Sequence, residues 1–143
     1  MIELSTLYRR AEQLNIPVHH IPLPLTGSVS CMDREGNCAI GLDLPHRWTR
    51  NELRVRLAHE LGHCTTGSFY NRYSPCDIRK AHENRADKYA VAALISEEEL
   101  DEAVAAGITE PWALAEHFGV DEDFLKKAVC LYTYGNLAAE LYF

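Results

Sequence analysis

The sequence predicts an α+β fold, in which a small antiparallel β-sheet packs on a pair of long helices and a helical C-terminal third follows. Three patterns predict it: short strand-like runs in residues 28–44, two long helical patterns in 49–95, and shorter capped helices in 96–143. A length of 143 residues suits one hydrophobic core. We therefore expect a single domain over residues 1–143, with a helix and the small sheet in 1–48.

The first third of the chain is predicted to hold one helix and short strands. Residues 2–14 place their apolar side chains roughly on one face of a helix, and Pro17 follows its end. The proline-rich segment 18–25 is unsuited to a central strand, so it is an edge strand or an extended connector. Residues 28–32 and 38–44 flank the polar sequence DREGN, which predicts a β-hairpin.

The helices are marked by their termini. Thr49 and Glu52 form the T-x-x-E pattern of a capping box, and Gly67 is expected to end the first long helix. The second long helix covers about 78–95, where alanines predict close helix packing. Three shorter helices are expected to follow, beginning after Ser96, near Pro111 and after Asp121.

Composition limits the classes of function. The net charge of −7 disfavours a general affinity for nucleic acid or for acidic membranes. The sequence has no apolar run of about 20 residues and no secretory leader pattern, so we expect a cytoplasmic protein without a membrane partner. The five cysteines form no C-x-x-C pair and are expected to be reduced thiols: Cys31, Cys38, Cys64, Cys76 and Cys130.

Residues 59–63 read HELGH, which is the H-E-x-x-H pattern. Positions four apart lie on the same face of a helix, so His59 and His63 can offer two imidazole nitrogens to one metal ion. Glu60 lies about 100° further round the helix, where it can act as general base on a water at the metal without being a ligand. This arrangement is typical of zinc hydrolases, and we expect one Zn²⁺ per chain.

The third metal ligand is expected on the second long helix, because a catalytic zinc has three protein ligands and one open position. Glu83 and Asp87 are four residues apart on one face of that helix. We expect Glu83 to bind the metal and Asp87 to accept a hydrogen bond from a ligand imidazole, which orients that ring. His82 is the alternative third ligand, although it points about 100° away from Glu83.

Hydrolysis of a peptide bond also needs a donor for the developing oxyanion. Four side chains near the motif are candidates, and the sequence does not choose among them: Tyr70, Tyr73, His82 and Arg85. Two histidines and one glutamate around an open tetrahedral site favour zinc over manganese or iron.

Residues 111–132 have the rhythm of a helix-turn-helix but lack the charge that DNA binding needs. The N-terminal end of a recognition helix contacts base edges and needs positive charge nearby. Here that end reads DED, and residues 96–123 contain ten acidic residues and no lysine or arginine. We expect a helical hairpin used for packing or protein recognition, and no direct contact with nucleic acid.

The sequence LAHELGHC in residues 57–64, followed by ENRADKYAVAALI in 83–95, resembles the ImmA/IrrE-type metallopeptidases. The resemblance implies a zincin-like pair of helices and an intracellular zinc-dependent protease. Such proteins are often encoded on phages and mobile elements, and they act on helix-turn-helix repressors. The resemblance implies these roles: His59, His63 and Glu83 as zinc ligands, Glu60 as general base, and Asp87 as the acidic residue after the third ligand.

Two functional hypotheses follow. The first is an intracellular zinc endopeptidase of narrow specificity that cleaves a repressor of a phage or mobile element. The second is a non-catalytic regulatory protein that contains a metal and docks a partner through its C-terminal helices. Glu60 discriminates between them, because a structural metal site has no use for a carboxylate in that place.

Overall fold

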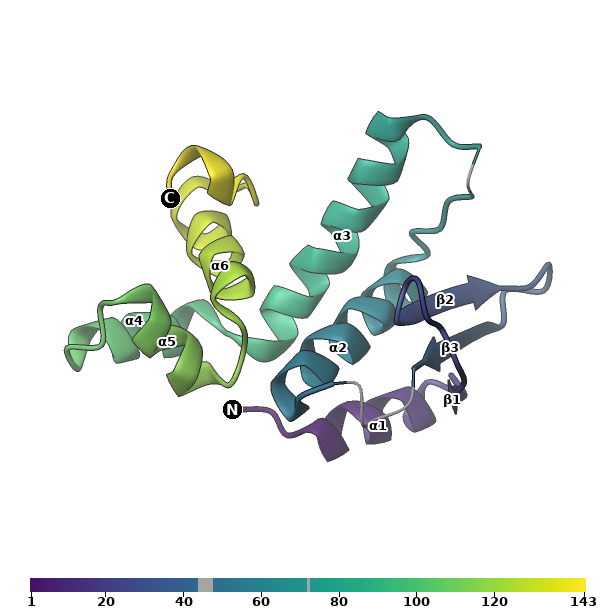
Figure 1. The fold of residues 1–143 in the computed structure, drawn as a ribbon, viewed down its shortest axis with the longest axis horizontal. Helices are drawn as coiled ribbons and strands as arrows, with labels where there is room; N and C mark the ends of the chain where they lie inside the picture. The colour runs from purple at the N-terminus through teal and green to yellow at the C-terminus, as the bar shows by residue number, and fades with distance from the viewer. Residues whose placement is uncertain (44–47, 72) are drawn as a thin grey trace.

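The computed structural model describes residues 1–43, 48–71 and 73–143. The described residues form an α+β fold, as predicted (Figure 1). Its elements, in chain order, are α1 (Leu4–Gln13), β1 (Val18–His20), β2 (Ser28–Met32), β3 (Cys38–Leu42), α2 (Arg50–Thr66), α3 (Cys76–Leu94), α4 (Glu97–Ala105), α5 (Pro111–Phe118), α6 (Glu122–Tyr134) and a 3-10 turn, η2 (Ala139–Leu141).

The sheet has three strands in the order β1-β3-β2. β2 and β3 form the predicted antiparallel hairpin, with Ser30 opposite Ile40. β1 lies on the other edge of β3 and runs parallel to it, with Val18 opposite Ile40. The predicted antiparallel pairing is therefore confirmed for β2 and β3, and β1 adds a parallel edge that makes the sheet mixed, because the chain reverses direction twice between β1 and β3 and these two strands pair directly. The expected end of this hairpin at residue 44 lies outside the described residues.

The long helix α2 begins and ends where the sequence predicts. The Thr49 hydroxyl accepts a hydrogen bond from the Glu52 backbone N–H at 3.1 Å, and the Glu52 carboxylate accepts one from the Thr49 N–H at 2.8 Å. Gly67 ends the helix with a φ of 67°, a left-handed conformation that favours glycine. Because both ends are determined by local hydrogen bonds and backbone conformation, they could be identified from the residues alone.

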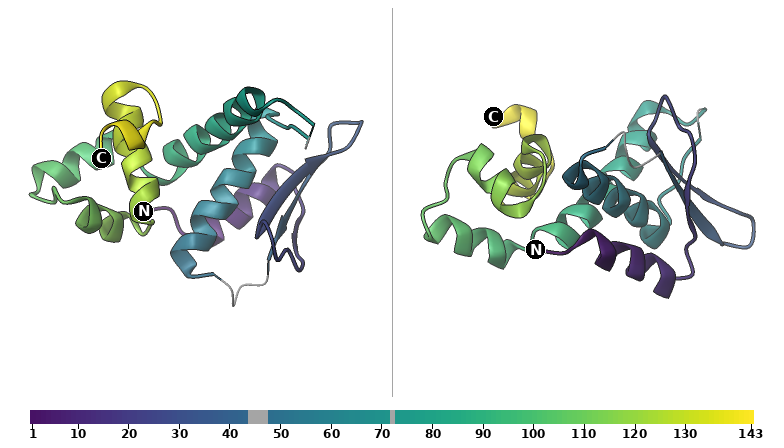
Figure 2. Two further views of the ribbon diagram at one scale, coloured as in Figure 1. Left: turned by 45° about the horizontal axis from the view of Figure 1, so that its top comes forward. Right: turned by 60° about the horizontal axis from the view of Figure 1, so that its bottom comes forward.

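α2 lies between the sheet and α3, with α1 packed along it (Figures 1 and 2). Leu57 and Leu61 are fully buried in the core that these elements share. Gly62 allows α2 and α3 to approach closely, because a Cβ atom at this position would lie 2.6 Å from the carbonyl oxygen of Ala86. The histidines of α2 and Glu83 of α3 therefore lie close enough to contact each other.

The helices α4, α5 and α6 form the C-terminal third and begin at the predicted caps. α6 packs against α3. The buried guanidinium of Arg54 on α2 donates hydrogen bonds to the carbonyl oxygens of Phe118 and Gly119 at the end of α5, and to that of Ile2. These bonds tie the C-terminal third and the N-terminus to the helix of the HELGH motif.

A disulfide joins Cys38 of β3 to Cys64 of α2, with the two α-carbons 5.9 Å apart. The expectation of reduced thiols was wrong for this pair, because the sheet packs on α2 and brings together two cysteines 26 residues apart. Cys31, Cys76 and Cys130 are free thiols. Within the described ranges, no helix is both long and apolar enough to cross a membrane.

Candidate metal centre

α2 and α3 bring the three expected ligands to one point. The Nε2 atoms of His59 and His63 lie 3.2 Å apart. The Glu83 carboxylate spans both, with Oε2 2.8 Å from His59 Nε2 and Oε1 3.1 Å from His63 Nε2. Ligand atoms about 2.0–2.1 Å from a tetrahedral zinc lie roughly 3.3 Å from one another. This donor set therefore fits a zinc-sized cation in both chemistry and spacing.

Each imidazole is held at its second ring nitrogen, which directs Nε2 toward the centre. The sequence left open which imidazole Asp87 would contact. In the structure His59 Nδ1 lies 2.7 Å from Asp87 Oδ1, so Asp87 orients His59. His63 Nδ1 donates to the backbone carbonyl of Ser68, which is fully buried just after the C-cap of α2. Asp87 also pairs through Oδ2 with Lys127 Nζ of α6 at 3.0 Å.

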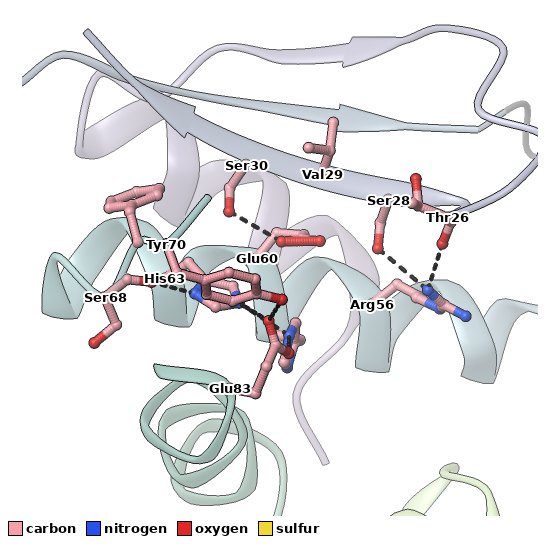
Figure 3. Close-up of a pocket in the computed structure, with 12 residues that line it drawn as sticks. Thr26, Ser28, Val29, Ser30, Arg56, Glu60, His63, Ser68, Tyr70 and Glu83 are labelled. Carbon is pink, nitrogen blue, oxygen red and sulfur yellow. Dashed lines mark hydrogen bonds and ion pairs between the residues drawn. The ribbon is translucent and has the colours of Figure 1, made fainter. Parts of the chain in front are cut away.

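Glu60 lies beside the two histidines but makes a different contact from Glu83. Its side chain is buried, and Oε1 accepts a hydrogen bond from the Ser30 hydroxyl of β2 at 3.0 Å (Figure 3). The ligand atoms of His59, Glu60 and His63 all lie within 4.8 Å of one another. Because Glu83 contacts both Nε2 atoms and Glu60 is bound to the sheet, the geometry favours Glu83 as ligand and leaves Glu60 next to the centre.

A cleft of about 330 Å³ opens over these groups. One wall is β2 with Ser28–Ser30, and the floor is α2 (Figure 3). Phe69 and Tyr70 also line the cleft. Arg56 lines the same cleft and donates to the Thr26 carbonyl at 2.9 Å. A cleft of this size accepts side chains of an extended segment and is too small for a folded domain.

Tyr70 is the only one of the four candidate oxyanion donors among the described residues that line this cleft. Its hydroxyl donates to Glu83 Oε1 at 2.7 Å (Figure 3). His82 stacks on the Tyr70 ring, with ring centroids 6.2 Å apart, and the structure brings Glu83 rather than His82 to the two ligand imidazoles. Tyr73 and Arg85 are exposed.

The model of the IrrE N-terminal-like domain, a family of peptidases, matches residues 11–129. The chain belongs to this family. The matched range includes β2, α2 and α3 and every residue of the centre described above, so the resemblance noted in the sequence is confirmed. Membership of the IrrE N-terminal-like family points to a metallopeptidase. No curated protein and no solved structure gave a significant match.

The electrostatics of this IrrE-like centre favour protons on the imidazoles when no metal is bound. Burial lowers the pKa of His59, but hydrogen bonds to Asp87 and Glu83 outweigh it and raise that pKa to about 10. The pKa of His63 is also raised, because Glu83 and the Ser68 carbonyl outweigh burial. Burial raises the pKa of Glu83, but its bonds to the imidazoles hold that pKa far below the ordinary range. A divalent cation therefore competes with protons for these groups.

Three contacts of the IrrE-like centre were not expected from the sequence. Ser30 could have been suspected, since the alternation of SVSCM places Ser28 and Ser30 on one face of a strand. The contact of the Ser68 carbonyl with His63 could be suspected only indirectly, because Gly67 ends α2 and lets the chain turn back toward the helix. Lys127 is 40 residues from Asp87 in the chain, and no local pattern points to their contact.

Proposed function

We propose that this chain is a zinc-dependent endopeptidase of narrow specificity, with His59, His63 and Glu83 as the metal ligands. The observation on which this rests is the Glu83 carboxylate, whose two oxygens lie 2.8 and 3.1 Å from the two imidazole Nε2 atoms. A site with two histidines and one carboxylate keeps a fourth position open, as catalytic zinc sites do. The IrrE N-terminal-like family supports the same chemistry.

Glu60 is proposed as the general base. A bound Zn²⁺ would supply Lewis-acid chemistry at the scissile carbonyl and acidify a nearby water. The Glu60 carboxylate takes the proton from the attacking water and later delivers it to the leaving amine. The Ser30 hydroxyl holds one oxygen of Glu60, so the other stays available in the cleft. Both roles need a carboxylate that is fixed near the metal without being bound to it.

Tyr70 is proposed as the donor for the developing oxyanion. Burial and its hydrogen bond to Glu83 raise the pKa of the Tyr70 phenol to about 12, so this group keeps its proton at neutral pH. Its hydroxyl lies in the cleft beside the ligands. In this role the hydroxyl would give up its bond to Glu83 Oε1 once Glu83 holds a metal, and would donate to the substrate carbonyl oxygen instead.

The proposed substrate is a helix-turn-helix repressor of a phage or mobile element, cleaved inside the cell. The resemblance to ImmA/IrrE-type proteins supports this class of substrate. The charge of the chain supports it as well, because a net charge of −7 favours encounter with a basic, DNA-binding protein. The small cleft, of about 330 Å³, favours an extended segment of that repressor, such as an exposed loop or linker.

The test pairs metal content with cleavage. Wild type, Glu60→Gln and Glu98→Gln are purified without chelator, bound metal is measured by mass spectrometry, and each is incubated with purified helix-turn-helix repressors of phages and mobile elements. Glu98 is an exposed residue of α4, so its variant matches the charge change away from the centre. We expect one zinc in all three proteins, and cleavage by wild type and Glu98→Gln only.

The other outcomes discriminate between the hypotheses. Zinc in all three proteins with cleavage by none would favour the non-catalytic regulatory protein that docks a partner through its C-terminal helices. Absence of metal from wild type would contradict the ligand assignment. Cleavage by Glu60→Gln at the wild-type rate would contradict the role of Glu60 as base.

A further inference from the structure

One side chain of the C-terminal third reaches the candidate metal centre. Lys127 of α6 places Nζ 3.0 Å from Asp87 Oδ2, while Asp87 Oδ1 lies 2.7 Å from His59 Nδ1. A continuous line of polar contacts therefore runs from α6 through α3 to α2. We propose that Lys127 is a positioning residue, which fixes Asp87 against His59 and thereby sets the affinity of the site for a divalent cation. This inference rests on the ligands of the proposed function.

Asp87 needs two partners to hold one orientation. Its side chain is only 17% exposed, so little water is available to solvate a carboxylate oxygen that lacks a protein partner. With His59 on one oxygen and Lys127 on the other, rotation of the carboxylate breaks both contacts. Without Lys127, Oδ2 would turn toward solvent and the hydrogen bond to His59 Nδ1 would weaken. The His59 ring would then be less well directed toward the metal.

Two effects of Lys127 on metal affinity oppose each other. Its positive charge repels an incoming cation, so removing the charge would by itself strengthen binding. The Lys127 side chain is 39% exposed, however, so water and salt screen this repulsion. Loss of a group that orients a ligand typically weakens metal affinity by about 10- to 100-fold, and for Lys127, one contact further out, we expect roughly 3- to 10-fold. The loss of orientation therefore outweighs the loss of repulsion, and we expect removal of Lys127 to weaken zinc binding.

The neighbouring Lys126 provides a matched control. It lies on the same helix, carries the same charge and pairs with Glu122 at 3.5 Å rather than with Asp87. Lys126→Met therefore changes the net charge of the chain as Lys127→Met does, while the line from α6 to His59 stays intact. Lys127→Arg tests the conservative change, because a guanidinium keeps the charge and can donate to the same carboxylate oxygen.

The experiment measures zinc affinity by competition with a chromogenic chelator, on the 143-residue chain, for wild type, Lys127→Met, Lys127→Arg and Lys126→Met. We expect Lys127→Met to bind zinc roughly 3- to 10-fold more weakly, with Lys127→Arg and Lys126→Met close to wild type. An affinity for Lys127→Met equal to or tighter than that of wild type would overturn the proposal. Thermal unfolding of the metal-free proteins checks that each variant is folded, and Lys127→Gln replaces Lys127→Met if that variant is not.

A double-mutant cycle with Asp87→Asn tests whether Lys127 acts through Asp87. If it does, adding Lys127→Met to Asp87→Asn leaves the zinc affinity unchanged. A further loss equal to that of the single variant would show that Lys127 acts through packing of α6, and would overturn the inference. A wild-type chain that binds no zinc would overturn the proposed metal site itself. A wild-type chain that binds zinc only as tightly as Lys127→Met would overturn the role of Lys127 and leave the metal site standing.

Discussion

The hydroxyl of Ser30 donates a hydrogen bond of 3.0 Å to the carboxylate of Glu60, which joins the edge strand β2 to the HELGH helix. The bond holds a buried carboxylate in the cleft without placing it among the ligands. The sheet therefore contributes to the orientation of the proposed general base, in addition to forming one wall of the cleft.

Replacement of Ser30 by alanine should lower the rate of cleavage and leave the metal content unchanged. A hydrogen bond to a charged group contributes about 1.5–3 kcal/mol, so we expect kcat to fall roughly 10- to 100-fold if Glu60 loses its orientation. Ser30→Thr keeps the hydroxyl and should retain most of the activity. The measurement is the rate of repressor cleavage alongside zinc content. An unchanged rate for Ser30→Ala would show that other contacts position Glu60.

Gly62→Ala should destabilise the protein, although the same change at an exposed helical position stabilises. Alanine is favoured over glycine in a helix by about 1 kcal/mol. Here a Cβ atom would lie 2.6 Å from the carbonyl oxygen of Ala86, so α2 and α3 must move apart. We expect overpacking to outweigh propensity and to lower the free energy of unfolding by about 1–3 kcal/mol.

Urea denaturation of the metal-free chain measures this change. Ala92→Ser adds one atom at an exposed position of α3 and should alter the stability little. Because Gly62 also sets the distance between the histidines and Glu83, zinc affinity should fall in Gly62→Ala. A stabilised Gly62→Ala protein would mean that the two helices have room to separate without loss.

Removal of the Cys38–Cys64 disulfide should lower stability under oxidising conditions only. The bond closes a loop with a sequence separation of 26, and a cross-link over a loop of this length contributes about 3 kcal/mol. The paired change Cys38→Ser with Cys64→Ser is compared with wild type by urea denaturation, with and without a reductant. The exposed free thiol of Cys76 offers the control Cys76→Ser, which should match wild type in both conditions. Equal stability of wild type with and without reductant would contradict this prediction.

Zinc affinity should keep rising with pH well above neutrality. Metal binding needs neutral imidazole, and the pKa of His59 in the metal-free chain is raised to about 10 from an ordinary value of 6.5. An unperturbed histidine would make the affinity level off near pH 7. Here displacement of the His59 proton alone should strengthen zinc binding by about tenfold per pH unit up to roughly pH 10. Chelator competition at pH 7, 8 and 9 measures this dependence, and a plateau from pH 7 would contradict it.

The raised pKa of His59 also makes the stability of the metal-free chain depend on pH. The charged imidazole stabilises the folded chain fully below the unfolded pKa of 6.5, and this contribution is lost as pH rises through about 10. The metal-free protein should therefore lose stability between these values, as measured by its urea midpoint. His59→Gln should show a smaller loss over the same interval.

Features that depend on neighbouring residues could be predicted from the amino-acid sequence alone. His59 and His63 share a face because of the helix period, and Thr49, Glu52 and Gly67 set the ends of α2 through local hydrogen bonds and a left-handed residue. The same reasoning placed Glu83 and Asp87 on one face of α3. These predictions needed no knowledge of how the elements pack.

Contacts between elements, in contrast, could be known only from the way the helices and strands pack. The bonds of Ser30 with Glu60 and of Lys127 with Asp87 join residues 30 and 40 positions apart. The disulfide and the parallel pairing of β1 with β3 likewise depend on which strand lies beside which element. Helical period and capping are set within about one turn of chain, whereas these partners meet only when the sheet and α6 pack against α2 and α3.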